Sequence, residues 1–162
     1  WGVLQGHIAR ANPLWKHYQT TEPVLILFHG AQHYITPNWY PSKHEHGKVV
    51  PTWNYEVVQA KGLLTLHHEP EWIVQQMQAI TAQQESNFTP AWRIEDAPAD
   101  YIANMVKAVV GIEITLTELI GKSKLSQNQS AANQTGVTQG LEHLATSEAK
   151  LMANAIKLTS PH

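Results

Sequence analysis

Aromatic, cationic and hydroxyl side chains are concentrated between Ile35 and Tyr55, in the stretch ITPNWYPSKHEHGKVVPTWNY. Tryptophan and tyrosine rings offer flat surfaces for stacking on a planar ligand. Lysines and hydroxyls suit a phosphate, the lysines through charge and the hydroxyls through directed hydrogen bonds. The candidate phosphate-binding residues are Ser42, Lys43, Lys48 and Thr52. Solvated lysines and core tryptophans are the alternative, but the density of these residue types in one run favours a ligand-binding segment.

A second polar cluster lies in the stretch GKSKLSQNQS, from Gly121 to Ser130. Its amide side chains can pair with the donor and acceptor edge of a heterocycle. Serine, glutamine and asparagine are also common in surface loops, so composition alone favours a plain loop here. The cluster is therefore a candidate second half of a binding site. It comprises Lys122, Lys124, Ser126, Gln127 and Asn128.

Histidines are abundant, with 10 in the chain, but their spacing does not favour a metal site. His44 and His46 lie two apart in a segment bounded by proline and glycine, and no third ligand is obvious. The chain has no cysteine, which excludes thiolate ligands, disulfides and cysteine nucleophiles. Glycine-rich phosphate loops, nucleophile elbows and zinc-protease helices are also absent. We expect neither a metal nor a catalytic residue.

Composition is that of one soluble globular domain spanning residues 1–162, with 43% hydrophobic residues and a net charge of −2. The longest apolar runs fall well short of the roughly 20 residues of a membrane helix. The lack of cysteine fits a reducing compartment, and we expect a cytoplasmic protein. Because the sequence starts at Trp1, within an apparent strand, we also expect a fragment that lacks its N-terminal strands.

The pattern of the first 67 residues predicts mostly strands. The apolar run Val24–Phe28, closed by Gly30, predicts a hairpin with His33–Thr36. The breakers in Pro37–Lys48 predict an ordered loop. The remaining predictions are a strand at Val3–Ala9, a short helix through Leu14 to Tyr18, and strands at Val49–Tyr55, Val57–Ala60 and Leu63–Leu66 with a bend at Lys61-Gly62.

From Pro70 onward apolar residues recur mainly at helical spacing. Helices are predicted from Pro70 to Gln84 and from Asp96, with Pro98 inside its first turn, to a stop at Gly111. Near-alternation in Ile112–Leu119 predicts another strand. Two terminal helices are expected at Ser130–His143 and Ser147–Leu158, about residues 130–158 overall. The fold class is therefore α+β, with a mainly β core.

Several ordered motifs resemble the PaiB-type FMN-binding negative transcriptional regulators. They are GHIARANPLW, ITPNWYPSK, HGKVVPTWNY, DAPADYIANM, VVGIEI and GKSKLSQN, and the resemblance spans Gly6 to about Leu141. The resemblance implies an FMN-binding split β-barrel, similar to the pyridoxamine-phosphate-oxidase-like flavoproteins, that forms a homodimer with flavin at the interface. Ser123 departs from the family pattern, in which tryptophan is common at this position.

The resemblance also implies which residues contact the flavin. Ser42, Lys43 and Thr52 would hold the phosphate, Trp39 and Trp53 would flank the ring, and Gln127 and Asn128 would reach its polar atoms. The full expected set is Trp39, Tyr40, Ser42, Lys43, Val50, Thr52, Trp53, Asn54, Lys124, Ser126, Gln127 and Asn128.

The implied function is negative regulation of transcription by an FMN-binding dimer. Direct DNA binding gains no support from charge, because Glu142, Glu148, Lys150 and Lys157 of the terminal helices sum to zero. Two alternatives remain open: a flavin-dependent oxidoreductase, and a haem-binding split-barrel protein suggested by the many histidines.

Overall fold

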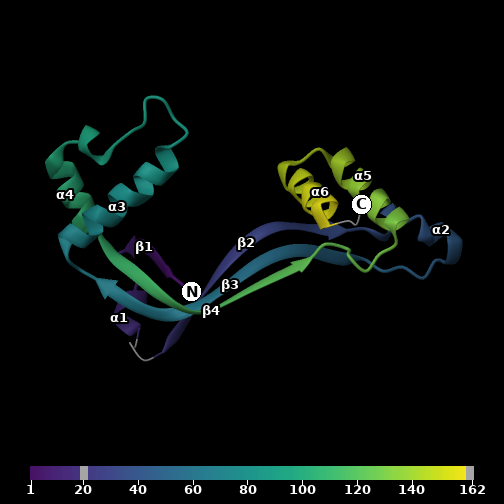
Figure 1. The fold of residues 1–162 in the computed structure, drawn as a ribbon, viewed down its shortest axis with the longest axis horizontal. Helices are drawn as coiled ribbons and strands as arrows, with labels where there is room; N and C mark the ends of the chain where they lie inside the picture. The colour runs from purple at the N-terminus through teal and green to yellow at the C-terminus, as the bar shows by residue number, and fades with distance from the viewer. Residues whose placement is uncertain (19–21, 160–162) are drawn as a thin grey trace. The chain divides into compact units, whose positions relative to one another are not determined.

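The protein, seen in a computed structural model that describes residues 1–18 and 22–159, combines helices with one four-stranded sheet (Figure 1). The strand order is β1-β4-β3-β2, and β1 pairs with β4 in antiparallel fashion, Val3 facing Thr115 and Ala9 facing Val109. The predicted α+β class is confirmed. The elements are β1 (Val3–Ala9), α1 (Leu14–His17), β2 (Pro23–Ile35), the 3₁₀ helix η1 (Pro37–Trp39), α2 (Ser42–His46), β3 (Thr52–His67), α3 (Pro70–Glu85), the 3₁₀ helix η2 (Ile94–Asp96), α4 (Ala99–Lys107), β4 (Val109–Lys124), α5 (Ala131–Leu144) and α6 (Ser147–Thr159).

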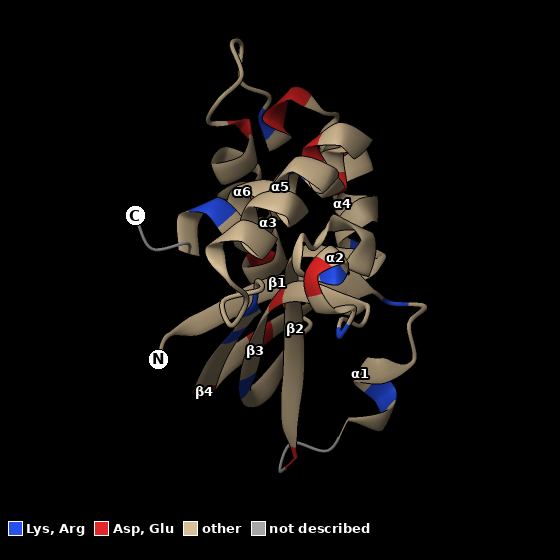
Figure 2. Ribbon diagram, turned by 90° about the vertical axis from the view of Figure 1, so that its right-hand side faces the viewer, with Lys and Arg blue, Asp and Glu red and all other residues tan. Residues whose placement is uncertain are grey.

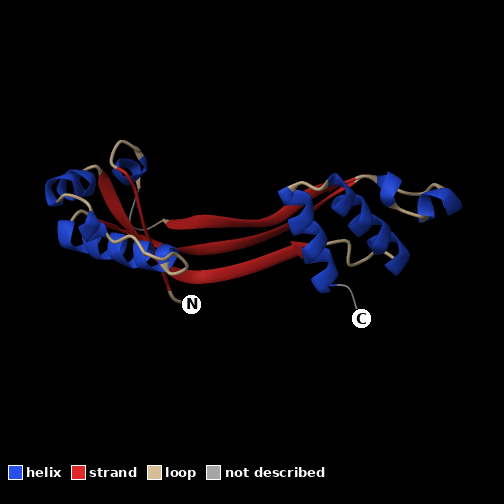
Figure 3. Cartoon of the chain, turned by 90° about the horizontal axis from the view of Figure 1, so that it is seen from above, coloured by secondary structure: helices blue, strands red, loops and turns tan. Residues whose placement is uncertain are grey.

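Two compact units divide the chain. Unit 1 comprises Trp1–Leu25 and Ala60–Leu119, and unit 2 comprises Ile26–Gln59 and Ile120–His162. Strands β2, β3 and β4, red in Figure 3, contribute residues to both units. The single domain expected from the sequence stays a prediction. None of the helices within residues 1–18 and 22–159 is both long and apolar enough to cross a membrane.

In unit 1, helix α3 packs against β1 and α4. Ile73 of α3 is buried, and Trp72 beside it stacks on His67 with ring centroids 4.0 Å apart and planes inclined by 4°. Gly111 of β4 makes room for this stack, because a Cβ atom there would overlap the indole ring of Trp72. A contact of 2.7 Å between His7 Nδ1 and Gln76 Oε1 ties β1 to the same helix.

The predicted hairpin around Gly30 is wrong, because β2 continues through this residue to Ile35. A Cβ atom at Gly30 would lie 3.0 Å from the Cβ atom of Glu56. The predicted bend at Lys61-Gly62 is also wrong, because β3 is continuous and a Cβ at Gly62 would overlap the carbonyl of Thr115 in β4. Both glycines permit close approach between neighbouring segments instead of forming turns.

The segment Pro37–Lys48, predicted as a loop, contains η1 and α2. Its prolines stand where helices tolerate them: Pro37 is the first residue of η1, and Pro41 is the N-cap of α2. The Thr36 hydroxyl accepts a hydrogen bond from the Asn38 N–H at the start of η1, and Gly47, with φ of 67°, ends α2. In sequence, a proline at a helix start looks the same as a proline that ends a helix.

The helix predicted from Asp96 to Gly111 is shorter in the structure. Asp96 ends η2, where its carboxylate accepts a hydrogen bond from the Arg93 N–H, and α4 begins after Pro98. Gly111 lies inside β4, which continues past Leu119 and includes Lys122 and Lys124 of the predicted polar loop. Helices α3, α5 and α6 and strand β1 lie where the sequence predicts them.

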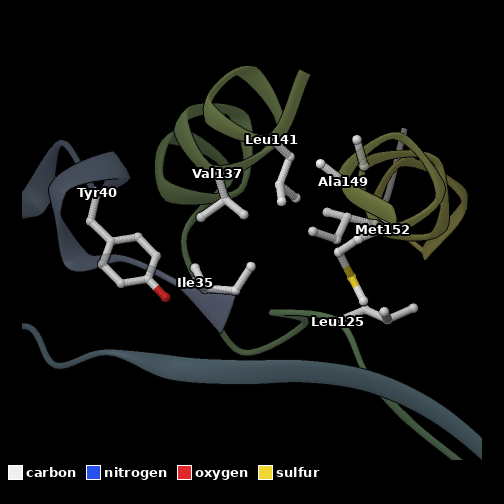
Figure 4. Close-up of a cluster of buried hydrophobic side chains, with 9 residues drawn as sticks. Ile35, Tyr40, Leu125, Val137, Leu141, Ala149 and Met152 are labelled. Carbon is white, nitrogen blue, oxygen red and sulfur yellow. The ribbon is translucent and has the colours of Figure 1, made fainter. Parts of the chain in front are cut away.

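The core of unit 2 is formed by α5 and α6 packing together over the end of β2. Figure 4 shows Val137 and Leu141 of α5 and Met152 of α6 pointing toward one another, with Ile35 beside them. Their side chains are fully shielded from solvent. The other buried members are Tyr40, Leu125, Ala149, Ala153 and Ile156.

Two glycines one turn apart on α5 allow this helix to lie directly against η1. A Cβ atom at Gly136 would overlap the backbone carbonyl of Trp39, and one at Gly140 would overlap the indole ring of the same residue. Larger residues at these positions would push the helix away. The glycines therefore set where the first turn of α5 lies.

We predict that Gly136→Ala destabilises the protein. Alanine favours a helix over glycine by about 1 kcal/mol, but overpacking against a rigid carbonyl costs about 1–3 kcal/mol. The net loss should appear as a lower urea midpoint in equilibrium unfolding. Gly6→Ala is the control, because a Cβ at that position would meet only the Ile112 side chain, at an ordinary contact distance of 3.7 Å. Equal stability of the two variants would contradict the close-approach role of Gly136.

Candidate functional site

A pocket of about 580 Å³ lies within unit 2. Its walls come from the segment following η1, the start of β3, the end of β4 with the turn after it, and the first turn of α5. The lining residues are Tyr40, Ser42, Glu45, His46, Lys48, Val49, Val50, Thr52, Asn54, Lys124, Ser126, Asn128, Gln129, Ser130 and Asn133.

Strand geometry explains which residues of β3 reach the pocket. Side chains two apart on a strand point to the same face, so Thr52 and Asn54 both line the pocket. Trp53, between them, lies outside the lining and is 49% exposed. From the end of β4, the Lys124 ammonium group donates a hydrogen bond of 2.6 Å to the Thr52 hydroxyl.

Asn54 contributes a deeply buried amide to this pocket, with 0% exposure. Its Nδ2 group donates a hydrogen bond of 2.9 Å to Ser126 Oγ. Its Oδ1 atom is buried without a hydrogen-bond partner among the residues that the structure describes. Buried polar groups in proteins are almost always paired, so this unpaired acceptor makes Asn54 a candidate ligand-binding residue.

The charged groups of the pocket belong to exposed residues, whereas the buried groups are neutral. Lys48 and Lys124 are exposed cations, and Glu45 is an exposed carboxylate of the same lining. His46 accepts a hydrogen bond from the backbone N–H of Lys48 at its Nδ1 atom, 3.0 Å away. Burial raises the pKa of Tyr40, which therefore stays neutral well above pH 7. An anionic end of a ligand is favoured on the lysine side.

The first turn of α5 is joined to the segment after η1 by Asn133. Its amide donates to Ser42 Oγ at 3.0 Å, and its carbonyl accepts from the Ser42 backbone N–H at 3.3 Å. Ser130 caps the helix by accepting from the Asn133 N–H, and the first turn carries no acidic residue. The partial positive charge of a helix N-terminus therefore adds to that of the lysines.

The structure brings most of the sequence-predicted site residues together and leaves four outside. Tyr40, Ser42, Val50, Thr52, Asn54, Lys124, Ser126 and Asn128 line the pocket, whereas Trp39, Lys43, Trp53 and Gln127 do not. The flavin contacts assigned to all twelve residues stay predictions.

Specific contacts hold three of the four outside residues elsewhere. Lys43 donates to Asn38 Oδ1 at 2.6 Å. Trp39 packs on α5 at Gly140. Gln127 folds back on its own turn, accepting from the Leu125 N–H at 2.7 Å and donating to the Ser123 carbonyl at 3.1 Å.

Sequence reasoning missed the contribution of α5. Ser130 carries a local signal, because serine before a helix with a polar residue three positions later is a capping pattern. The pairing of Asn133 with Ser42, 91 positions apart, leaves no such signal. Glu45, His46 and Gln129 also line the pocket without having been assigned to it from the sequence.

The histidines behind the haem alternative do not share a site. His44 and His46 both lie on α2, where residues two apart are separated by about 200° around the axis. His46 lines the pocket, while His44 borders a separate groove with Trp39 and His143. Over residues 1–18 and 22–159, no three histidine, aspartate or glutamate side chains are gathered as metal ligands would be.

Comparison with known proteins gives related sequences over nearly the whole chain. An uncharacterised protein of Emericella nidulans is 34% identical over 182 residues, covering 96% of this chain and 72% of that protein. The protease synthase and sporulation protein PAI 2 of Bacillus subtilis is 26% identical over 154 residues, covering 95% of this chain and 72% of that protein. The solved flavocytochrome Anf3 of Azotobacter vinelandii superposes with a TM-score of 0.47 at 12% identity, over 75% of this chain and 50% of the other.

Residues 1–118 match the family described as "Putative FMN-binding domain". FMN, the cofactor predicted from the sequence motifs, is the one that this description names. The pocket residues from Lys124 to Asn133 lie beyond the matched region, within the part aligned with the relatives. Because the match spans most of the chain and agrees with the motifs, this protein belongs to the putative FMN-binding domain family, in which the sequence resemblance had placed it.

Proposed function

We propose that this protein binds FMN in the pocket of unit 2. The observation that carries the proposal is a lining that combines exposed lysines with a buried amide carbonyl, that of Asn54, for which the described residues supply no hydrogen-bond donor. The volume of about 580 Å³ falls within the range of roughly 300–1,000 Å³ that is usual for sites of small molecules and cofactors. FMN has a matching combination of a charged phosphate and a neutral ring.

The phosphate side uses Lys124 and Lys48 with the hydroxyls of Thr52 and Ser42. Lys124 is held by Thr52, and Ser42 is held by Asn133, so these donors are already ordered before a ligand arrives. The neutral ring reaches Asn54, where a charged group would be costly to bury. Bound FMN would supply redox chemistry, and the residues of the chain would bind and orient it.

We further propose that the protein acts as a homodimeric, PaiB-type negative regulator. The Bacillus subtilis relative is named for protease synthesis and sporulation, which supports a regulatory setting. Net charge is −2, and Figure 2 shows Lys and Arg interspersed with Asp and Glu over several elements. Because the chain has a slight negative net charge instead of the positive charge that phosphate contacts need, we propose that repression acts through a partner. Sequence-specific DNA retention by the purified protein at physiological salt would contradict this arrangement.

A groove of about 440 Å³ in unit 2 supports self-association. Phe28 and Val58 in its lining are 48% and 38% exposed, although both are apolar. Glu56 and Lys122 line the same groove, so a second copy would offer each charge its opposite across a two-fold axis. A neighbouring copy of this chain is therefore the occupant that we propose for the groove.

We predict that Lys124→Met weakens FMN binding by roughly tenfold to a hundredfold, the scale of a charge-assisted hydrogen bond. Riboflavin, which lacks the phosphate, should lose little affinity. Quenching of flavin fluorescence on titration with protein measures both dissociation constants. Lys150→Met is the control, because Lys150 is exposed on α6 and lies outside the lining. This variant should bind both flavins as tightly as the unaltered protein does.

Two results would count against this assignment. Equal losses for FMN and riboflavin would remove Lys124 from the phosphate. A strong loss of FMN in Lys43→Met, with Lys124→Met unaffected, would return the phosphate to the position expected from the sequence. Absence of binding by the unaltered protein would overturn the FMN proposal itself.

We predict that Phe28→Glu converts the dimer to a monomer, because it buries a carboxylate beside Glu56 in the proposed interface. Light scattering during size-exclusion chromatography should then give half the mass of the unaltered protein. Leu158→Glu is the matched control, because this leucine is 88% exposed on α6 and lies outside the groove. A monomeric unaltered protein, or a dimeric Phe28→Glu variant, would refute this interface.

A further inference from the structure

We propose that the Asn54 carbonyl is the specificity-determining acceptor of the pocket and takes a hydrogen bond from the N3–H group of the flavin ring. This inference rests on the proposed binding of FMN. It assigns a direction to the ligand, with the pyrimidine edge of the ring against Asn54 and the phosphate toward the lysines. It also explains the Asn54 Oδ1 atom, which has no hydrogen-bond partner within residues 1–18 and 22–159.

The orientation of the Asn54 amide is set by Ser126. The amide has one donor group and one acceptor atom, and the donor is committed to Ser126 Oγ at 2.9 Å in a contact shielded from water. The acceptor Oδ1 is therefore presented in one direction only. Because the residue is 0% exposed and lines the pocket, we assign a ligand in that pocket as the donor to Oδ1.

The backbone at Ser126 is held in an uncommon conformation, with φ of 63°. Non-glycine residues rarely adopt positive φ, and serine has no special preference for it. The turn is maintained by hydrogen bonds to the Ser126 carbonyl from the Gln129 N–H at 2.9 Å and from Gln134 Nε2 at 3.1 Å. Glycine would relieve this backbone strain but would remove the hydroxyl that orients Asn54.

The chemistry of FMN leaves few groups that can satisfy Asn54. The phosphate presents acceptors and carries charge, so it is repelled by a buried carbonyl and attracted by the exposed Lys48 and Lys124. The oxidised ring has one N–H group, at N3. A neutral ring edge can enter a buried wall at little cost when its polar groups are paired. Ribityl hydroxyls are the competing donors, and the experiment separates them from N3–H.

The test compares FMN with N3-methyl-FMN, which lacks the ring N–H, on the full chain. Sites built around a ligand N–H reject analogues without it, because the buried acceptor is left unpaired. We expect the methylated flavin to bind the unaltered protein about tenfold more weakly or worse. Fluorescence titration measures both constants. This comparison needs no variant, so a folding defect cannot obscure it.

Variants then assign the effect to Asn54. In Asn54→Ala the ratio of the two dissociation constants should fall toward one, while the preference for FMN over riboflavin, which reports on the phosphate, should persist. Ser126→Gly should likewise lower the ratio for FMN and its N3-methyl analogue and leave the preference for FMN over riboflavin, because the Asn54 amide loses the hydroxyl that orients it. Asn38→Ala, which alters an asparagine of unit 2 outside the lining, should retain both ratios.

The outcomes distinguish this inference from the function on which it rests. If FMN binds and its N3-methyl analogue binds equally well, the Asn54 assignment is overturned while FMN binding stands. A folded Asn54→Ala protein that still rejects the methylated flavin would also overturn the assignment, by directing N3 to another group. If neither flavin binds, the proposed function and the inference fall together.

Discussion

The site depends on the close approach of α5 to the 3₁₀ helix at Trp39. Gly136 and Gly140 make this approach possible, because a methyl group at either position would overlap Trp39. The approach seats the first turn of α5 at the pocket, where Asn133 holds Ser42 through two hydrogen bonds. A small displacement of α5 would therefore change the position of the pocket residues as well as the packing of the core.

The charged and the neutral polar groups of the pocket differ in their exposure to solvent. Charged side chains remain exposed to water, where keeping them ionised costs little, and the neutral Asn54 amide is withdrawn from solvent. The Ser126 hydroxyl accepts a hydrogen bond from the amide nitrogen of Asn54. We propose that the amide oxygen accepts one from a ligand. The uncommon backbone conformation of Ser126 fits this arrangement, since backbone strain is retained where the surrounding structure and the site require a particular side chain.

Glycine and proline explain most differences between the expected and observed elements. Gly30, Gly62 and Gly111 appear in sequence as turn or stop signals, yet each lies within a strand where a neighbour comes too close for a Cβ atom. Pro37 and Pro41 appear as helix breakers, yet each stands at the start of a short helix. These residues permit more than one local conformation, and only the neighbouring segment selects between them.

The sequence by itself determined the family, the α+β class and the run of aromatic, cationic and hydroxyl residues from which the pocket is built. Periodicity placed the helices with continuous apolar faces, because that signal is local. Tertiary structure decided which members of the run share one cavity. Because side chains alternate along β3, Thr52 and Asn54 line the pocket and Trp53 does not. Lys43 is also outside the lining, where it donates a hydrogen bond to Asn38. The contribution of Asn133 came from 91 residues downstream of Ser42, a pairing that depends on how α5 packs and that no local pattern encodes.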